Sequence, residues 1–387
     1  MIKVLLFLFA NNFMHYGNYF SVLMIILLLF ESKLKVSIIK KSSFVCLVLA
    51  SVTYCILYLK NFPAPSSSTF YLVFVSPIVM YYVGICQGKR GKEVLKNEII
   101  ILSFAGVLHG VMNVIKNRGI DILAIAGRSY SDIYGGQISG TLQNLFFIMS
   151  SSLLFYFLVI EKKKILKICG SVAGLAGIIG SIVNASRTMI FVTLIIFFMC
   201  LFLYFYEKYG LGTSLFKFIG TGIALIGIAL FGLWVNIFNI QQVLLDSALG
   251  QRETAAVQTS SVVHNLRWEY SGEILRRLPA NPFGGIDYAH YAHNLWLDIA
   301  KETGIIPFIF YIAFSFISLV IIVRVYRDAQ IDIGYKYVIV PVMLAFILAF
   351  FTEPIMQGSP ISFSLFCFVV GGIEGANIKN LKCDKVI

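Results

Sequence analysis

Long apolar segments alternate with short polar ones along almost the whole chain. A helix needs about 20 apolar residues to cross the hydrocarbon core of a bilayer, and eleven runs approach that size. Residues 2–12 form a shorter apolar piece, either a twelfth short span or a segment at the membrane surface. The pattern predicts an all-α polytopic integral membrane protein with about 11–12 transmembrane helices. The eleven runs lie near residues 13–30, 43–59, 68–87, 98–115, 136–160, 168–184, 188–206, 215–237, 304–323, 336–352 and 358–378.

The composition supports this class. Of the 387 residues, 58% are hydrophobic and 13% are charged, about half the charged fraction of roughly 25% that is usual in globular proteins. A soluble fold of this size exposes too much surface to hide so many apolar side chains. This excludes cytosolic enzymes, secreted disulfide domains and disordered scaffolds. The seven cysteines show no CxxC spacing, and we interpret them as small apolar residues of membrane helices.

The positive charges give the chain an orientation. The formal net charge is +12, and with eleven spans the basic clusters fall on one side in strict alternation. The positive-inside rule makes that side cytoplasmic, and the C-terminus lies there as well. The excess charge is therefore an orientation signal, and we expect no nucleic-acid partner. The clusters are Lys33–Lys41, Lys89–Lys96, Lys162–Lys167, Lys208 with Lys217, Arg324–Lys336 and Lys379–Lys385.

One long connection, residues 238–303, falls on the opposite side in this topology. Links between helices are usually shorter than about a dozen residues, and longer ones are usually functional. The long connection contains three of the five histidines and two of the three tryptophans. We therefore divide the chain into an N-terminal transmembrane bundle (1–237), a large extracytoplasmic loop (238–303) and C-terminal transmembrane helices (304–387).

The end of the long loop carries the first candidate for catalysis. After His293 the pattern becomes helical and Gly304 can end it, so His293 is expected at the N-terminus of a short surface helix beside the membrane. Such an end has free backbone N–H groups and favours anions, and a base beside a bound phosphate suits catalysis. The alternative is an interfacial helix whose His293 and Trp296 lie at headgroup level.

A metal site is the other chemistry that this segment suggests. His290 and His293 are three residues apart, with Asp287 nearby, and this spacing can ligate a metal ion. Two histidines and one carboxylate without a further strong ligand are a weak signal. We therefore expect no metal, and we treat His290 as a supporting residue.

Arginines are the candidate phosphate ligands. Arg187 falls in a very short outer connection, where a guanidinium is costly unless it pairs with an anion or extends to the surface. Its planar fork of donors binds phosphate bidentately, although contact with lipid headgroups explains its position equally well. Arg267 is a second candidate, in the long loop. Glu353 is either a counter-ion of one of these arginines or an ordinary carboxylate at a helix end.

Few ionisable residues fall near the centres of the predicted spans. Transporters and proton-coupled proteins usually place such groups at the midplane, whereas here the polar residues gather at the outer face. This argues against a transporter of lipid-linked sugars, the alternative from another functional class. We interpret His109, Asn113 and Asn144 as polar contacts between helices.

Together these residues resemble the O-antigen ligase and O-antigen polymerase superfamily of bacterial envelope glycosyltransferases. The resemblance covers the whole chain by topology and a smaller part of it by motif. Pro307 departs from the residue that ligases tend to have three positions after the motif glycine, and this favours the polymerase subtype. The features that carry the resemblance are, in chain order, the Arg128–Gly140 stretch, Ser186-Arg187-Thr188, Arg267-Trp268, the Asn281–Gly285 turn, His293-Asn294 with nine residues before Gly304, and Glu353.

The resemblance implies an enzyme that acts on sugar chains linked to undecaprenyl diphosphate, at the outer face of the bacterial inner membrane. It implies inversion at the anomeric carbon without a metal or cofactor. We expect a polymerase of O-antigen, capsule or exopolysaccharide, with a ligase that transfers the chain to lipid A core as the alternative. Expected partners are the bilayer and the flippase and chain-length regulator of the same pathway. The implied site residues are His293 as base, Arg187 and Arg267 as diphosphate ligands, and Asn294, Glu353 and Arg128 as supporting residues.

Overall fold

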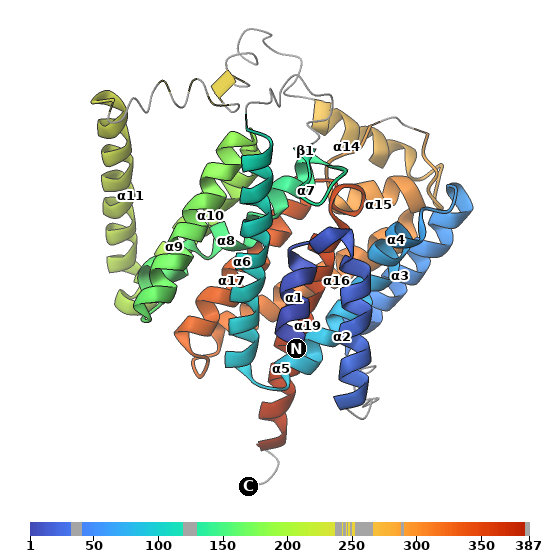
Figure 1. Ribbon diagram of the computed structural model, residues 1–387, viewed down its shortest axis with the longest axis horizontal. Helices are drawn as coiled ribbons and strands as arrows, with labels where there is room; N and C mark the ends of the chain where they lie inside the picture. The colour runs from blue at the N-terminus through green and yellow to red at the C-terminus, as the bar shows by residue number, and fades with distance from the viewer. Residues whose placement is uncertain are drawn as a thin grey trace.

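The computed structural model of the protein describes residues 1–31, 41–118, 130–236, 266–287 and 290–383, together with positions 242, 245, 247, 250 and 251. Within these residues the chain is a bundle of helices with one hairpin of two very short strands (Figure 1). The chain is thus an all-α membrane protein, as the sequence predicts. Much of the predicted large loop lies outside the described residues.

The helices follow one another with short links over most of the described chain. Single π-helical turns, Tyr71–Val75 and Tyr156–Ile160, interrupt or end two of the spans. In the hairpin, Tyr130 pairs with Ile138 and Ser131 with Gln137 in an antiparallel register. The elements are α1 (Ile2–Ala10), α2 (Gly17–Glu31), α3 (Ser42–Asn61), α4 (Ser67–Phe70), α5 (Ser76–Gly88), α6 (Lys92–Lys116), β1 (Tyr130–Ser131), β2 (Gln137–Ile138), α7 (Gly140–Leu145), α8 (Ile148–Ser152), α9 (Lys164–Val183), α10 (Arg187–Tyr209), α11 (Leu211–Trp234), α14 (Leu266–Arg277), α15 (Leu295–Thr303), α16 (Ile305–Arg327), α17 (Ile333–Phe350), α18 (Ile355–Gly358) and α19 (Pro360–Cys383).

Nine helical segments of the described chain are long and apolar enough to cross a membrane, and they coincide with nine of the predicted spans. The protein is therefore a multi-pass membrane protein. The other two predicted spans correspond to α2 and α11, whose described residues include the apolar stretches Gly17–Phe30 and Leu211–Leu225. The apolar piece at residues 2–12 forms α1, which has 9 residues, extends over only about 14 Å and packs against α2 and α6.

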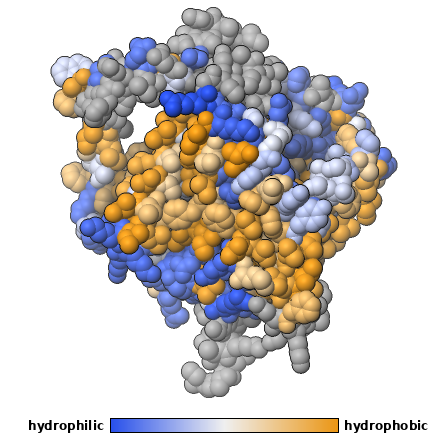
Figure 2. Space-filling model, in the orientation of Figure 1, coloured by the Kyte–Doolittle hydropathy of each residue, from blue (hydrophilic) through white to orange (hydrophobic). Residues whose placement is uncertain are grey.

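The two ends of the bundle carry different elements. Figure 1 shows α7, α14 and α15 at one end, which we call the α15 end, and the end of α19 and the link from α5 to α6 at the other. That link carries the basic residues Lys89 and Arg90. Figure 2 shows an apolar band across the molecule between two hydrophilic regions. A bilayer imposes this distribution, because polar groups are satisfied more easily at its two interfaces than in its core.

α5 and α19 pack with their backbones in direct contact. Each helix carries a pair of glycines four residues apart, Gly84–Gly88 on α5 and Gly371–Gly375 on α19, as in the GxxxG motif of membrane helices. A Cβ atom added at Gly371 would lie 2.1 Å from the carbonyl oxygen of Tyr81. No side chain fits at this distance, so the approach of the two helices depends on glycine.

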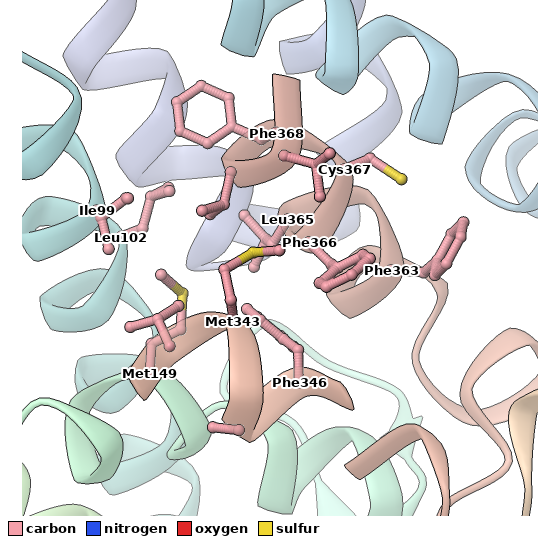
Figure 3. Packing of buried hydrophobic residues seen from close by; sticks show 14 of the residues in the cluster. Ile99, Leu102, Met149, Met343, Phe346, Phe363, Leu365, Phe366, Cys367 and Phe368 are labelled. Atoms are coloured by element: carbon pink, nitrogen blue, oxygen red, sulfur yellow. The ribbon is translucent and has the colours of Figure 1, made fainter. Parts of the chain in front are cut away.

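Aromatic rings fill the space between α17 and α19. The ring centroid of Phe350 lies 5.1 Å from that of Phe366 and 5.7 Å from that of Phe363. Figure 3 shows Phe346, Phe363 and Phe366 in this cluster, with Met343 beside them. These side chains are buried, and their edge-to-face and tilted contacts fix the two helices against each other.

Gly371→Ala should destabilise the protein by about 1–3 kcal/mol, because the added methyl group meets a backbone atom that moves only if the helices separate. The measurement is the thermal unfolding temperature of the purified protein in detergent. Gly220→Ala, on α11, is the matched control, since a Cβ there meets no atom within 4 Å. Equal unfolding temperatures for the two variants would contradict the close contact of α5 and α19.

Candidate functional site

α15 is the centre of the candidate site. It begins after Asn294, whose Oδ1 accepts a hydrogen bond from the amide of Leu297 at 3.1 Å, and it ends at Gly304, where φ is +83°. Both ends agree with the helix that the sequence predicts. The expectation of a surface helix is wrong, because every residue of α15 except Leu297 is buried. The helix packs against α3, α14, α16 and α18 inside the α15 end of the bundle.

His293 immediately precedes α15 in a left-handed backbone conformation. Its φ is +55°, a region in which residues other than glycine are uncommon and in which asparagine, aspartate and histidine are enriched. The amides on either side of it donate to the carboxylate of Asp298, that of Ala292 at 2.7 Å and that of Asn294 at 3.1 Å. The His293 side chain is partly exposed. The backbone of the expected base is therefore attached to a buried carboxylate.

Two acidic side chains of α15 are buried, and the sequence analysis assigned no role to either. Burial raises the pKa of Asp298 to about 7, and burial also raises the pKa of Glu302. The carboxyl group of Glu302 accepts hydrogen bonds from Tyr54 of α3 at 2.6 Å and from Gln357 of α18 at 2.9 Å. It therefore connects three helices. The signal for these residues is weak in the sequence, since an amphipathic helix beside a membrane carries acidic residues in any case.

Lys301 and His290 connect the segment before His293 to α15 and α14. The Lys301 ammonium donates to the carbonyl of His290 at 3.2 Å and lies 4.4 Å from the centre of the Tyr291 ring. Burial lowers the pKa of Lys301. The His290 ring stacks on Tyr270 of α14, with centroids 4.6 Å apart. Within the described residues, no three His, Cys, Asp or Glu side chains are grouped to hold a metal ion.

A glycine turn packs against the end of α15. Gly284 and Gly304 have φ of +80° and +83°, and a Cβ atom on Gly304 would lie 2.1 Å from the carbonyl oxygen of Pro282. The amide of Ile305 donates to that same oxygen at 2.9 Å. The structure thus brings together two sequence motifs, the Asn281–Gly285 turn and the glycine that ends the helix after His293.

An apolar groove of about 350 Å³ follows α16 from the start of α15. Asn294 and Trp296 line it on the side of α15, and Phe308, Ile312 and Leu319 line it along α16. Nε1 of Trp296 donates to Ser315, between Ile312 and Leu319, at 3.0 Å. The α16 residues extend over about 16 Å of helix. Ile312 is 42% exposed on a membrane-spanning helix, so the groove is open toward the position of the bilayer.

Arg187 begins α10 at the α15 end of the bundle (Figure 1). Ser186 caps this helix, and its hydroxyl accepts from the amide of Met189 at 3.4 Å. The Arg187 side chain is partly buried. Arg267 is the second residue of α14, but its side chain lies outside the described residues, as does the whole of Arg128.

Glu353 lies in the turn after α17, close to the cap of α15. Its side chain is buried, and Thr141 of α7 donates to its carboxylate at 2.9 Å. Two residues earlier in the same turn, the carbonyl oxygen of Phe351 lies 3.5 Å from Nδ2 of Asn294. The structure therefore brings the turn of Glu353 next to the residue that follows His293.

A second polar cluster joins the hairpin to α6 and to the turn after α1. Asp132 is fully buried, accepts from His109 of α6 and pairs with His15 at 3.1 Å. The other ring nitrogen of His109 lies within hydrogen-bonding distance of the carbonyl oxygen of Asn11. His109 thus connects α6 to two loops, whereas Asn113 makes the predicted contact between helices, donating to α7 at 2.9 Å.

Comparison of the chain with models of known protein families gives no match, and comparison with curated protein sequences gives none either. The membrane-spanning helices are established by the structure itself. An activity has to be argued from the chemistry of the residues around α15 and from the groove beside it.

Asp132→Asn should destabilise the protein at neutral pH, and the difference from wild type should shrink in acid. Burial raises the pKa of Asp132, but the hydrogen bond and charge of His109, with further hydrogen bonds, lower it more, so the net pKa is below the ordinary value. Such a carboxylate stabilises the folded state above its unfolded pKa of about 3.9 and loses this contribution as pH falls through the folded value. Unfolding temperatures measured from about pH 7 down to about pH 3 test this, and a constant difference would contradict it.

Proposed function

We propose that the protein is a polysaccharide polymerase of the bacterial inner membrane. It is a glycosyltransferase whose donor is a growing sugar chain linked to undecaprenyl diphosphate. The chain is transferred to the terminal sugar of a new lipid-linked repeat unit at the periplasmic or extracellular face. The flippase that supplies the repeat unit and the regulator of chain length are the proposed partners in the pathway.

The observation that carries the proposal is the apolar groove that starts at the cap of α15. The proposed donor has a long isoprenoid tail and a charged head, so its site needs an apolar channel open to the bilayer that ends beside polar groups. The groove meets this need, since the polar Asn294 lines it together with the apolar Ile312 and Leu319. His293, the proposed base, is the residue directly before Asn294.

The proposed reaction needs one base and a site for the diphosphate. As the acceptor hydroxyl oxygen forms the new glycosidic bond, His293 takes its proton, and the bond from the anomeric carbon to the diphosphate breaks. The diphosphate leaves with the electron pair, and its negative charge is the charge to be neutralised. Arg187, at the N-terminus of α10, is the proposed ligand, because a guanidinium and free backbone N–H groups both favour phosphate. Arg267 is the second proposed ligand.

His293→Ala should abolish chain extension while the protein stays in the membrane. The assay is gel analysis of the polysaccharide in a deletion strain that carries each variant. Without the wild-type gene, we expect one repeat unit on the final acceptor and no long chains. Arg187→Lys should also fail, because lysine offers a point charge in place of a planar fork of donors.

Arg276→Lys is the matched control for the arginine, since Arg276 is exposed and pairs with Glu273 on its own helix. Normal long chains with His293→Ala would overturn the assignment of the base. Accumulation of lipid-linked polymer in the deletion strain would indicate a ligase instead of a polymerase.

Ile312→Trp should raise the KM for the lipid-linked donor several-fold, because the indole fills the groove that is proposed to hold the isoprenoid tail. The reaction at saturating donor should change little. Ile309→Trp is the matched control, since Ile309 is exposed on the same helix (53%) and is not among the residues that line the groove. Unchanged KM in both variants would show that the tail binds elsewhere.

A further inference from the structure

Asp298 holds the backbone on both sides of His293. Its Oδ1 accepts from the amide of Ala292 at 2.7 Å, and its Oδ2 accepts from the amide of Asn294 at 3.1 Å. We propose that Asp298 is the positioning residue of the reaction, because by fixing these two amides it keeps His293 in the conformation that presents the imidazole to the acceptor. This inference rests on the proposed role of His293 as the base.

The conformation of His293 needs such a support. A left-handed backbone is unfavourable for a residue with a side chain, and it persists only where the surroundings determine it. His293 has φ of +55° and lies in a segment without regular secondary structure, between Tyr291 and Asn294. Hydrogen bonds to an ionised carboxylate are stronger than those between neutral groups. Without them, we expect the segment to relax toward common conformations and the imidazole to leave its present position.

Capping of α15 accounts for only one of the two bonds of Asp298. Asn294 is the N-cap residue, and its side chain accepts from the amide of Leu297 while its own amide donates to Asp298, as in a capping box. The amide of Ala292 lies two residues before the cap. The bond to Ala292 therefore acts on the segment of His293 and not on the start of the helix.

Asp298 is also costly for stability, which argues against a purely structural role. Its pKa is raised to about 7, because burial, with the charge of Glu302, raises it more than the two amides and Lys301 lower it. Because the folded pKa is above the unfolded value of about 3.9, the contribution of this group to stability is full below the unfolded value and is lost as pH rises through the folded value. Buried ionisable groups of this kind are concentrated at functional sites.

Asp298→Asn is the variant that tests the inference. An asparagine has the same shape but only one acceptor oxygen, so its amino group faces one of the two backbone N–H groups whichever way it turns. Glu302→Gln is the matched control. Glu302 is a second buried carboxyl of α15, whose bonds go to the side chains of Tyr54, Gln357 and Tyr291 rather than to the two amides that flank His293.

The experiment uses the full-length protein in lipid nanodiscs and lipid-linked repeat units extracted from the deletion strain. Transfer kinetics are measured for the wild type, Asp298→Asn, His293→Ala, the double variant and Glu302→Gln. Hydrogen exchange of the amides of Ala292 and Asn294 is measured on the same samples, and thermal unfolding reports stability.

We expect Asp298→Asn to lower kcat by about 10- to 100-fold with little change in the donor KM, because a small misplacement of a catalytic group costs that much. The two amides should exchange faster. Added to His293→Ala, the change should have no further effect on residual transfer. Glu302→Gln should lower the unfolding temperature while kcat stays close to that of the wild type.

Each of the remaining outcomes would contradict one part of the proposal. Wild-type kcat with Asp298→Asn, or a further loss in the His293→Ala background, overturns the positioning role and leaves the proposed function intact. If Glu302→Gln lowers kcat as much as Asp298→Asn does, the loss is an effect of stability, and the positioning role of Asp298 is overturned. Wild-type transfer with His293→Ala overturns the base, and the inference about Asp298 falls with it.

Discussion

α15 is a buried helix beside a membrane, and it carries three ionisable side chains. Each of these side chains needs hydrogen-bonding partners, and this need determines the surroundings of the helix. A buried charge without partners costs several kcal/mol, so each group must meet hydrogen-bonding atoms. Asp298 meets the two amides that flank His293, Lys301 meets the carbonyl of His290, and Glu302 meets side chains of α3 and α18. The path of the chain before the helix and the approach of the neighbouring helices are therefore coupled through these bonds.

Glycine contacts determine how closely the other parts of the molecule approach. The hydrophobic driving force between helices is weak in lipid, so the close contact at Gly371 holds α5 and α19 together in its place. At the site, the contact between the Asn281–Gly285 turn and Gly304 fixes the point where α15 ends and α16 begins. The groove along α16 and the segment of His293 therefore belong to one compact unit.

The spans and the ends of α15 were predictable because local rules determine them. An apolar run of about 20 residues has few options in a bilayer other than a helix, since its backbone groups must bond to each other. Asn294 and Gly304 act on residues within one turn of themselves, so their roles as cap and stop follow from the sequence.

The partners across the bundle were not predictable. Tyr54 and Glu302 are 248 residues apart, and no local pattern indicates that they meet. An amphipathic helix suits an interface as well as an interior, so the burial of α15 was missed. The left-handed conformation of His293 and the pairing of His109 with Asp132 likewise depend on where distant segments pack.

The position of these groups at the end of the bundle suits the proposed reaction better than a position at its centre. A diphosphate at the midplane of a bilayer would lose its hydration, at a cost of several kcal/mol. In the proposed reaction the apolar groove at the α15 end is the site of the tail, and the head is placed near helix N-termini and Arg187. His293 is partly exposed there, so an acceptor sugar can reach it from the aqueous side. In the proposed site the apolar part of the substrate thus lies against the apolar part of the protein, and the charged part of the substrate lies at its polar end.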